Sequence, residues 1–169
     1  MRKQGVGGVT LPGSTGYTVG VSINAGQLSI RNGSARGGGR VPNNSVVELA
    51  LTADGTVVNQ LAGTGNLIKS GSSVATLNAA GSTAGAVTVG GGTLSFAQSG
   101  NFQAAALTTL GGATTDLRAG AAITLTGAFT PNSGATLNLS LGDLTPIIRA
   151  DSATLAGALN IDGFGSNMA

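Results

Sequence analysis

The stretch Ala86-Val-Thr-Val-Gly-Gly-Gly-Thr-Leu-Ser-Phe96 decides the fold, because it alternates apolar with small polar residues and interrupts the alternation with glycine. Related stretches return as Ser133-Gly-Ala-Thr-Leu-Asn-Leu-Ser-Leu141 and as Ala153-Thr-Leu-Ala-Gly-Ala-Leu-Asn-Ile161. A period of two indicates strands, and glycine at near-regular intervals indicates corners between them. The repeated pattern predicts a stacked β-solenoid.

Leucine recurs at intervals that suit such a coil. If one leucine is taken from each repeat, most steps are near twenty residues: Leu28, Leu49, Leu67, Leu94, Leu117, Leu137 and Leu159. That length suits one turn of a three-sided solenoid, with a short strand on each side and a small or polar corner. A lone coil cannot bury enough side chains to offset the entropy of ordering it, so the coils must stack. No segment has a helical pattern, so the chain is predicted to be all-β.

The composition predicts a thin aliphatic interior. The chain has 169 residues, of which 41% are hydrophobic, 3% are aromatic and 30 are glycine, and it lacks Trp, Cys and His. Small aliphatic side chains must therefore fill the core, for which we expect the following members: Leu94, Leu117, Ile123, Leu125, Leu137, Leu139, Ile147, Leu155, Leu159 and Ile161. The missing Cys and His exclude disulfides, thiol nucleophiles and Ser-His-Asp triads.

The N-terminal part of the chain is expected to be less ordered than the rest. Residues 1–16 are predicted to be a flexible leader, and residues 17–169 a β-helix with an Arg/Gly-rich loop or arm at 31–44. Five basic residues precede the first acid, Glu48: Arg2, Lys3, Arg31, Arg36 and Arg40. Because no aromatic residues interleave with them to stack on bases, we interpret the segment from Arg31 to Arg40 as a solvated insertion and expect no nucleic acid partner.

The acidic residues do not form a recognisable catalytic pattern. They are Glu48, Asp54, Asp116, Asp143, Asp151 and Asp162. Asp54, Asp143 and Asp162 adjoin glycine, which favours turns, and a paired-carboxylate site would need Asp116 and Asp151 on one face. Lys69-Ser70 follows Ile68 where a phosphate-binding loop needs glycine. We therefore predict no catalytic, cofactor-binding or metal-binding residues, no cofactor and no enzymatic activity.

Two segments, in this order along the chain, resemble the passenger domains of bacterial autotransporters, the type V secreted proteins. Gly63-Thr-Gly-Asn-Leu-Ile-Lys-Ser-Gly71, followed by Ala86-Val-Thr-Val-Gly-Gly-Gly-Thr-Leu94, is similar to their Gly-x-Gly, apolar-Lys-x-Gly and Gly-Gly-Thr-Leu strand repeats. The run 134–141 together with 146–161 is similar to the C-terminal end of such passengers, called the autochaperone region. The resemblance covers roughly residues 45–165.

This resemblance implies a right-handed parallel β-helix whose C-terminal coils, from about residue 100, fold first and template the rest. It implies a non-enzymatic stalk and folding nucleus, exported through the periplasm and displayed on a Gram-negative cell surface to carry an adhesin or virulence effector. The expected partners are the rest of the passenger and a C-terminal outer-membrane β-barrel outside this chain, with a host surface protein or self-association as further candidates.

Two alternatives stay open at this point. The chain could be a subunit of a self-assembling β-rich fibre or a virion surface, because uncapped solenoid ends leave strand edges that can pair between chains. An Asn/Thr-lined face could instead bind sugar or ice, although no residue marks a site for either. Mass in dilute solution separates a monomeric stalk from an assembling subunit.

Overall fold

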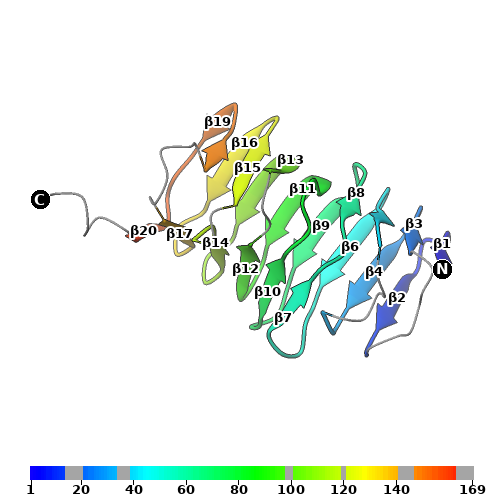
Figure 1. The fold of residues 1–169 in the computed structure, drawn as a ribbon. Helices are drawn as coiled ribbons and strands as arrows, with labels where there is room; N and C mark the ends of the chain where they lie inside the picture. Colours follow the sequence, from blue (N-terminus) through cyan, green and yellow to red (C-terminus); the bar gives the residue numbers. More distant parts are fainter. Residues whose placement is uncertain (14–20, 34–38, 98–100, 119–120, 141–146, 163–169) are drawn as a thin grey trace, which may run out of the picture.

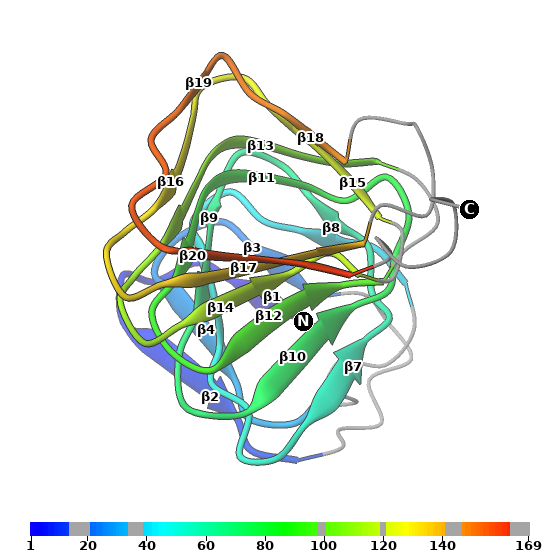
Figure 2. The same ribbon diagram turned by 90° about the vertical axis from the view of Figure 1, so that its left-hand side faces the viewer.

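The structure, a computed structural model, describes residues 1–13, 21–33, 39–97, 101–118, 121–140 and 147–162. These residues form a solenoid of parallel strands that stack along one axis, from the N-terminal coil to the C-terminal coil (Figure 1). Seen from the C-terminal end, the chain winds counterclockwise as it approaches the viewer, so the helix is right-handed (Figure 2). The predicted right-handed parallel β-helix is confirmed, with about seven turns roughly 20 residues apart.

The coil has three faces, and each face is a ladder of strands from successive turns. Face 1 contains β1 (Arg2–Lys3), β3 (Ser22–Ile23), β5 (Val41–Pro42), β8 (Leu61–Ala62), β15 (Ala122–Leu125) and β18 (Ile148–Arg149). Face 2 contains β2 (Gly8–Leu11), β4 (Gln27–Ile30), β6 (Val46–Leu49), β9 (Asn66–Lys69), β16 (Ala128–Pro131) and β19 (Ser152–Ala153). Two long strands, β11 (Thr83–Val89) and β13 (Asn101–Thr109), turn the corner and serve both faces.

Face 3 is a separate six-stranded ladder. Its strands, in stacking order, are β7 (Gly55–Val57), β10 (Val74–Leu77), β12 (Thr93–Phe96), β14 (Thr114–Asp116), β17 (Thr136–Ser140) and β20 (Ala158–Asp162). All of these pairs are parallel. Parallel pairing follows from the winding, because each strand runs in the same direction as its equivalent in the next turn.

The core is a set of columns in which each inward side chain packs on its equivalents in the turns above and below. On face 2, one column passes through direct strand partners in five successive turns: Leu28, Val47, Leu67, Val87 and Leu107. All five are at most 1% exposed. The column continues to Phe129 and then to Ala153, and these last two turns contain more residues than the earlier ones.

The glycine corners allow the coils to approach closely. Gly92 has a φ of 60°, and a Cβ at that position would overlap the carbonyl oxygen of Ser73 in the preceding turn. Glycine is therefore required there, because other L residues are strained in this left-handed region and need space that the corner lacks. This corner joins face 2 to face 3 and turns the chain between β11 and β12.

The predicted series of equivalent leucines is wrong in its register. Leu28 pairs with Val47 instead of Leu49, and Leu94 pairs with Thr115 instead of Leu117. Leu67 lies on face 2 and Leu94 on face 3, so these two are not equivalent positions. Each strand has two inward positions separated by one outward residue, so matching by leucine alone slips between them. Among the predicted equivalents, Leu137 and Leu159 are direct strand partners.

Residues 1–13 are not a flexible leader, because β1 pairs with β3 and β2 pairs with β4. Likewise the Arg/Gly-rich segment is shorter than predicted, because β5 within it pairs with β8 and Asn43 bridges to Ile23. Residues 14–16 and 34–38 lie outside the described residues. None of the described ranges contains a helix long and apolar enough to span a membrane.

Candidate functional site

The C-terminal end of the solenoid is an open apolar surface. A hollow of about 290 Å³ lies there, lined by Phe129, Leu137, Leu139, Ile148, Leu155 and Leu159 among others. Leu155 is 60% exposed and Leu159 is 48% exposed, unusually high for leucines on the core side of a coil. Exposed apolar patches of this kind mark interaction sites or regions that another part of an assembly covers.

The predicted core residues divide according to their distance from this end. Leu94, Leu117, Ile123, Leu125 and Leu137 are all buried, with at most 4% exposure. Leu139, Ile147 and Ile161 are half-buried, while Leu155 and Leu159 are exposed. The placement of Leu155 and Leu159 in the core is therefore corrected. They follow the inward pattern of the repeat, but no described residue stacks over them.

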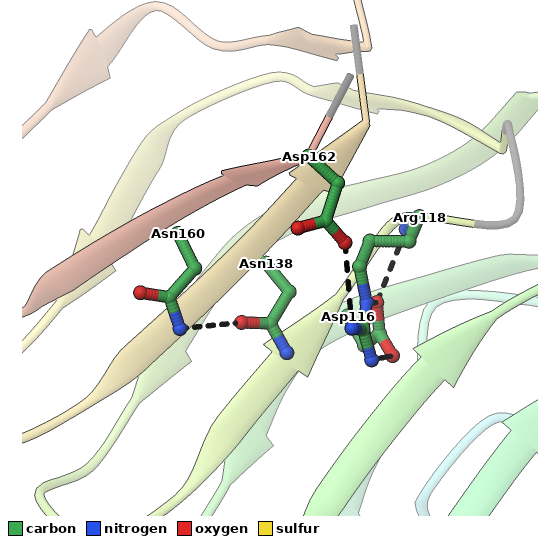
Figure 3. Close-up of polar contacts among 5 residues, drawn as sticks. All are labelled: Asp116, Arg118, Asn138, Asn160 and Asp162. Atoms are coloured by element: carbon green, nitrogen blue, oxygen red, sulfur yellow. Dashed lines mark hydrogen bonds and ion pairs between the residues drawn. The ribbon is translucent and has the colours of Figure 1, made fainter. Parts of the chain in front are cut away.

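Polar side chains form a ladder on the outer side of face 3, next to this open end (Figure 3). The amide of Asn160 on β20 donates from Nδ2 to Oδ1 of Asn138 on β17, at 3.0 Å. Arg118 donates from Nε and Nη2 to the two carboxylate oxygens of Asp116, at 3.0 and 2.9 Å. Its Nη1 lies 3.5 Å from Oδ2 of Asp162, so Arg118 connects β14 with the last strand across the intervening β17.

The charges of this cluster are fixed by their contacts. Burial opposes ionisation of Asp116, but the hydrogen bonds and the charge of Arg118 outweigh it and lower the pKa of that carboxyl. In turn, the hydrogen bonds and charge of Asp116 raise the pKa of Arg118 further. Asp116 thus stays ionised near neutral pH. The cluster holds an arginine between two carboxylates, which suits cross-linking of coils better than proton transfer.

A lysine lies inside the central coils. Lys69 occupies the inward position between Leu49 and Val89, and its side chain is 0% exposed. Its Nζ donates to the carbonyl oxygens of Ser70, Gly71 and Gly91 at 2.7, 2.9 and 3.0 Å. Three donors meet three acceptors, which is what a buried ammonium needs.

Burial lowers the pKa of Lys69, with a smaller opposing effect from the charge of Asp54. The three carbonyl oxygens belong to the face 2 to face 3 corners of two successive turns. Lys69 therefore ties two corners together from within the core.

A second polar cluster, built around a single carboxylate, lies on the outer side of face 2. Glu48 accepts from Ser70 Oγ at 2.8 Å and from Gln27 Nε2 at 2.7 Å, so it links three turns. Its pKa is lowered, chiefly by the hydrogen bond from Ser70, although burial acts in the opposite direction. Such hydrogen bonds to an ionised carboxylate stabilise the stack while the group stays charged.

The other acids lie apart from these clusters. Asp54 accepts from the backbone N–H of Val74 at 2.7 Å, and Asp151 lies between β18 and β19. Asp116 is on face 3, so it does not share a face with Asp151. Asp143 and Arg36 lie outside the described residues. Among the described residues, no three acids gather in a cluster suited to a metal ion.

The roles of Lys69, Arg118 and Asn160 are not among the predictions made from the sequence. For Arg118 the signal exists: Asp116, Asn138 and Asn160 are equally spaced strand partners, and Arg118, Ser140 and Asp162 follow them at the next outward position. For Lys69 no such signal exists, because a lysine in an alternating strand is read as outward by default.

No family model, no curated protein and no solved structure matches this chain.

Proposed function

We propose that this chain is a non-enzymatic segment of a surface-exposed autotransporter passenger, acting as a rigid stalk and as a folding nucleus. The observation that supports the stalk role best is the unbroken parallel pairing of face 3 from β7 to β20. Backbone hydrogen bonds join every turn to the next, and aliphatic columns fill the interior. A rod held by such repeated contacts transmits force along its axis and keeps its ends apart.

The proposal also rests on the sequence of the repeats. The Gly-x-Gly and apolar-Lys-x-Gly stretch places Lys69 where its ammonium ties two corners, and the Gly-Gly-Thr-Leu stretch forms the corner before β12. The resemblance to passenger repeats thus falls on residues that hold the coil together. In this proposal the chain reaches the surface of a Gram-negative cell through the periplasm, and its partners are the rest of the passenger and an outer-membrane barrel.

Display on a cell tests the stalk role. The chain is placed before an autotransporter β-barrel in a Gram-negative host, and its accessibility to external protease or antibody is measured. The parent should reach the surface, whereas Leu137→Asp should remain in the periplasm, because a charge in the column prevents stacking outside the cell. The control is Asn138→Asp on the outward side of the same strand. Equal display of both variants would refute the proposed coupling between folding and secretion.

Native-state hydrogen exchange tests the folding nucleus. If the coils from about residue 100 fold first, their amides should stay protected to higher urea concentration than those of β2 to β9. The free energy of exchange would then fall from β13–β17 toward the N-terminal turns. Stronger protection of the N-terminal turns would leave a stalk without a C-terminal nucleus.

A self-assembling fibre or virion subunit is the second candidate, and the exposed edge of β20 with Leu155 and Leu159 favours it. A fibre requires contacts that propagate, so the mass of the assemblies in solution should rise without limit as the protein concentration increases. A stalk should show a defined mass.

A further inference from the structure

Threonine occupies the same outward position of face 2 in four successive turns, on or next to β11, β13, β16 and β19 (Figure 1). Strand pairing places Thr88 beside Thr108 and Thr108 beside Thr130. The backbone N–H of Thr154 donates to the carbonyl oxygen of Phe129 at 2.9 Å, which continues the register so that Thr154 lies beside Thr130. The first three are half-buried by their neighbours in the ladder, and Thr154 is exposed. We call these four residues the threonine rank.

A second rank of small side chains runs beside the threonine rank, two residues earlier in each turn. It consists of Ala86, Ala106, Ala128 and Ser152. None of the eight side chains is charged, and within the described ranges no protein group forms a hydrogen bond with a hydroxyl of the threonine rank. The turns before Thr88 place Ile68 and Glu48 at the equivalent position, so the surface begins at β11.

The sheet fixes the spacing of this surface. Neighbouring strands lie about 4.8 Å apart, and residues two apart on one strand are about 6.6 Å apart, so the two ranks form a regular array. Threonine is β-branched and has few rotamers, so each methyl and each hydroxyl holds a defined position. Oxygen atoms on the surface planes of ice repeat at similar intervals in two directions.

We propose that the last four turns of face 2 form an ice-binding surface, in which the threonine hydroxyls occupy positions at the edge of the crystal lattice. Each hydroxyl donates one hydrogen bond and accepts others, as a lattice water does. The threonine methyls and the neighbouring rank of small side chains fill the spaces between these positions. Because the array is rigid before contact, little conformational entropy is lost on binding. The ice-binding alternative left open by the sequence thereby acquires a specific surface.

The chemistry of the two ranks favours ice over a sugar chain or a charged polymer. Neither rank contains an aromatic side chain, the group that stacks on the apolar face of a sugar ring. A charged polymer would meet no opposite charge in either rank. The nearest acid, Asp151, lies at the corner directly before Ser152. An uncharged array of hydroxyls and methyls matches a lattice of uncharged water molecules.

Face 3 supplies an internal comparison. Three of its successive turns also share one outward threonine position, with the strand partners Thr93, Thr114 and Thr136. Beside that position lies Asp116, whose carboxylate binds the exposed guanidinium of Arg118. We expect no ice binding there, because an exposed ion pair keeps its own hydration shell and interrupts the array. The inference concerns the free chain and does not depend on surface display, so it can fail while the proposed function stands.

Ice growth in the presence of the pure chain tests the proposal. The parent should hold a crystal from growing over an interval below its melting temperature, and it should be enriched in ice grown slowly from solution. Thr108→Tyr should lose both effects, because a large ring in the threonine rank keeps the crystal away from the other hydroxyls. The matched control is Thr114→Tyr at the centre of the face 3 position, which should keep both effects. An inactive parent, or equal behaviour of the two variants, would overturn the proposal.

A third variant and two binding assays complete the test. Ala106→Tyr, in the neighbouring rank, should also lose the effects on ice, and it replaces Thr108→Tyr if circular dichroism shows that variant to be unfolded. Retention of the parent on insoluble cellulose or chitin, without any effect on ice, would assign the surface to a sugar chain and refute the proposal. A rise in mass on sedimentation that Thr108→Tyr abolishes, again without any effect on ice, would assign the surface to a second copy and refute it equally.

Discussion

The central turns and the last turn have the same pattern of inward residues, yet their burial is opposite. Leu67 is 0% exposed, whereas Leu159 is 48% exposed. The difference comes from the neighbours: Leu67 has Val47 on one side and Val87 on the other, whereas among the described residues the only strand partner of Leu159 is Leu137. In this solenoid the position of a residue in the stack determines its burial as much as its own alternation does.

The largest expected effect comes from placing a charge at Leu137, which the last turn covers. The same charge at Leu159, in the last turn itself, is the matched comparison. Leu137→Asp should destabilise the fold by more than about 4 kcal/mol, because an unpaired carboxylate would lie in a covered column. Leu159→Asp, its direct strand partner, should lower the free energy of unfolding by less than about 1 kcal/mol in dilute protein, because water reaches that position. Urea unfolding followed by circular dichroism measures both. Similar losses would show that the open end is covered in solution.

Lysine offers the same comparison with a polar group. Lys69→Met should cost about 2 to 4 kcal/mol, because methionine fills the volume but leaves three buried carbonyls without a donor. Lys3, in the first turn, donates to the carbonyl oxygens of Gly5 and Ala25. Lys3→Met should cost less, because the terminal turn is closer to solvent. The urea midpoints of the two variants give the ranking, and a larger shift for Lys3→Met would contradict it.

Acid should weaken the stack through Glu48 and Asp116. Both pKa values are lowered in the folded state, so below the ordinary carboxyl range of about 4 the unfolded chain binds protons first. Stability is therefore present above that range and is lost as pH falls through the folded pKa values. In Glu48→Gln the slope of unfolding free energy against pH should be shallower. An unchanged slope would show that Glu48 does not contribute.

Alkaline pH should act in the opposite sense at Lys69. Its lowered pKa means that the unfolded chain holds the proton more tightly, so stability should increase as pH rises toward the ordinary lysine pKa of about 10.4. Unfolding free energies measured between neutral and alkaline pH should show this gain in the parent and lose it in Lys69→Met. The same gain in both proteins would assign it to other groups.

The smallest effect is expected at Arg118. Its ion pairs with Asp116 and Asp162 are exposed, so Arg118→Ala should leave the urea midpoint nearly unchanged. Hydrogen exchange should nevertheless become faster for the amides of β20, because the side chain that connects it to β14 is gone. Protection of β16, on another face, serves as the internal control. Faster exchange throughout the molecule would mean that the ion pairs stabilise more than the last strand.

The strands and corners could be predicted from the sequence, because alternation and glycine each have a direct physical meaning in a coil. The register could not, since inward positions are not always apolar. Thr115 stands opposite Leu94, and Lys69 stands between Leu49 and Val89. The bond between Arg118 and Asp162 joins residues that are distant in the sequence and depends on the lengths of two whole turns. The exposure of Leu159 depends on which residues stack over it, and the alternation of apolar and polar residues around Leu159 does not contain that information.

The equal steps between Val47, Leu67, Val87 and Leu107 have a consequence for how such a molecule can change length. Copying one such unit in tandem would insert a complete turn and shift every later residue by about 4.8 Å along the axis. The contacts between successive turns would all be reproduced at the new junction, so growth by duplication preserves the register. Toward the C-terminus, where the turns from Leu107 to Phe129 and on to Ala153 are longer, a copied unit would meet a wider cross-section. Elongation is thus easiest in the middle of the chain.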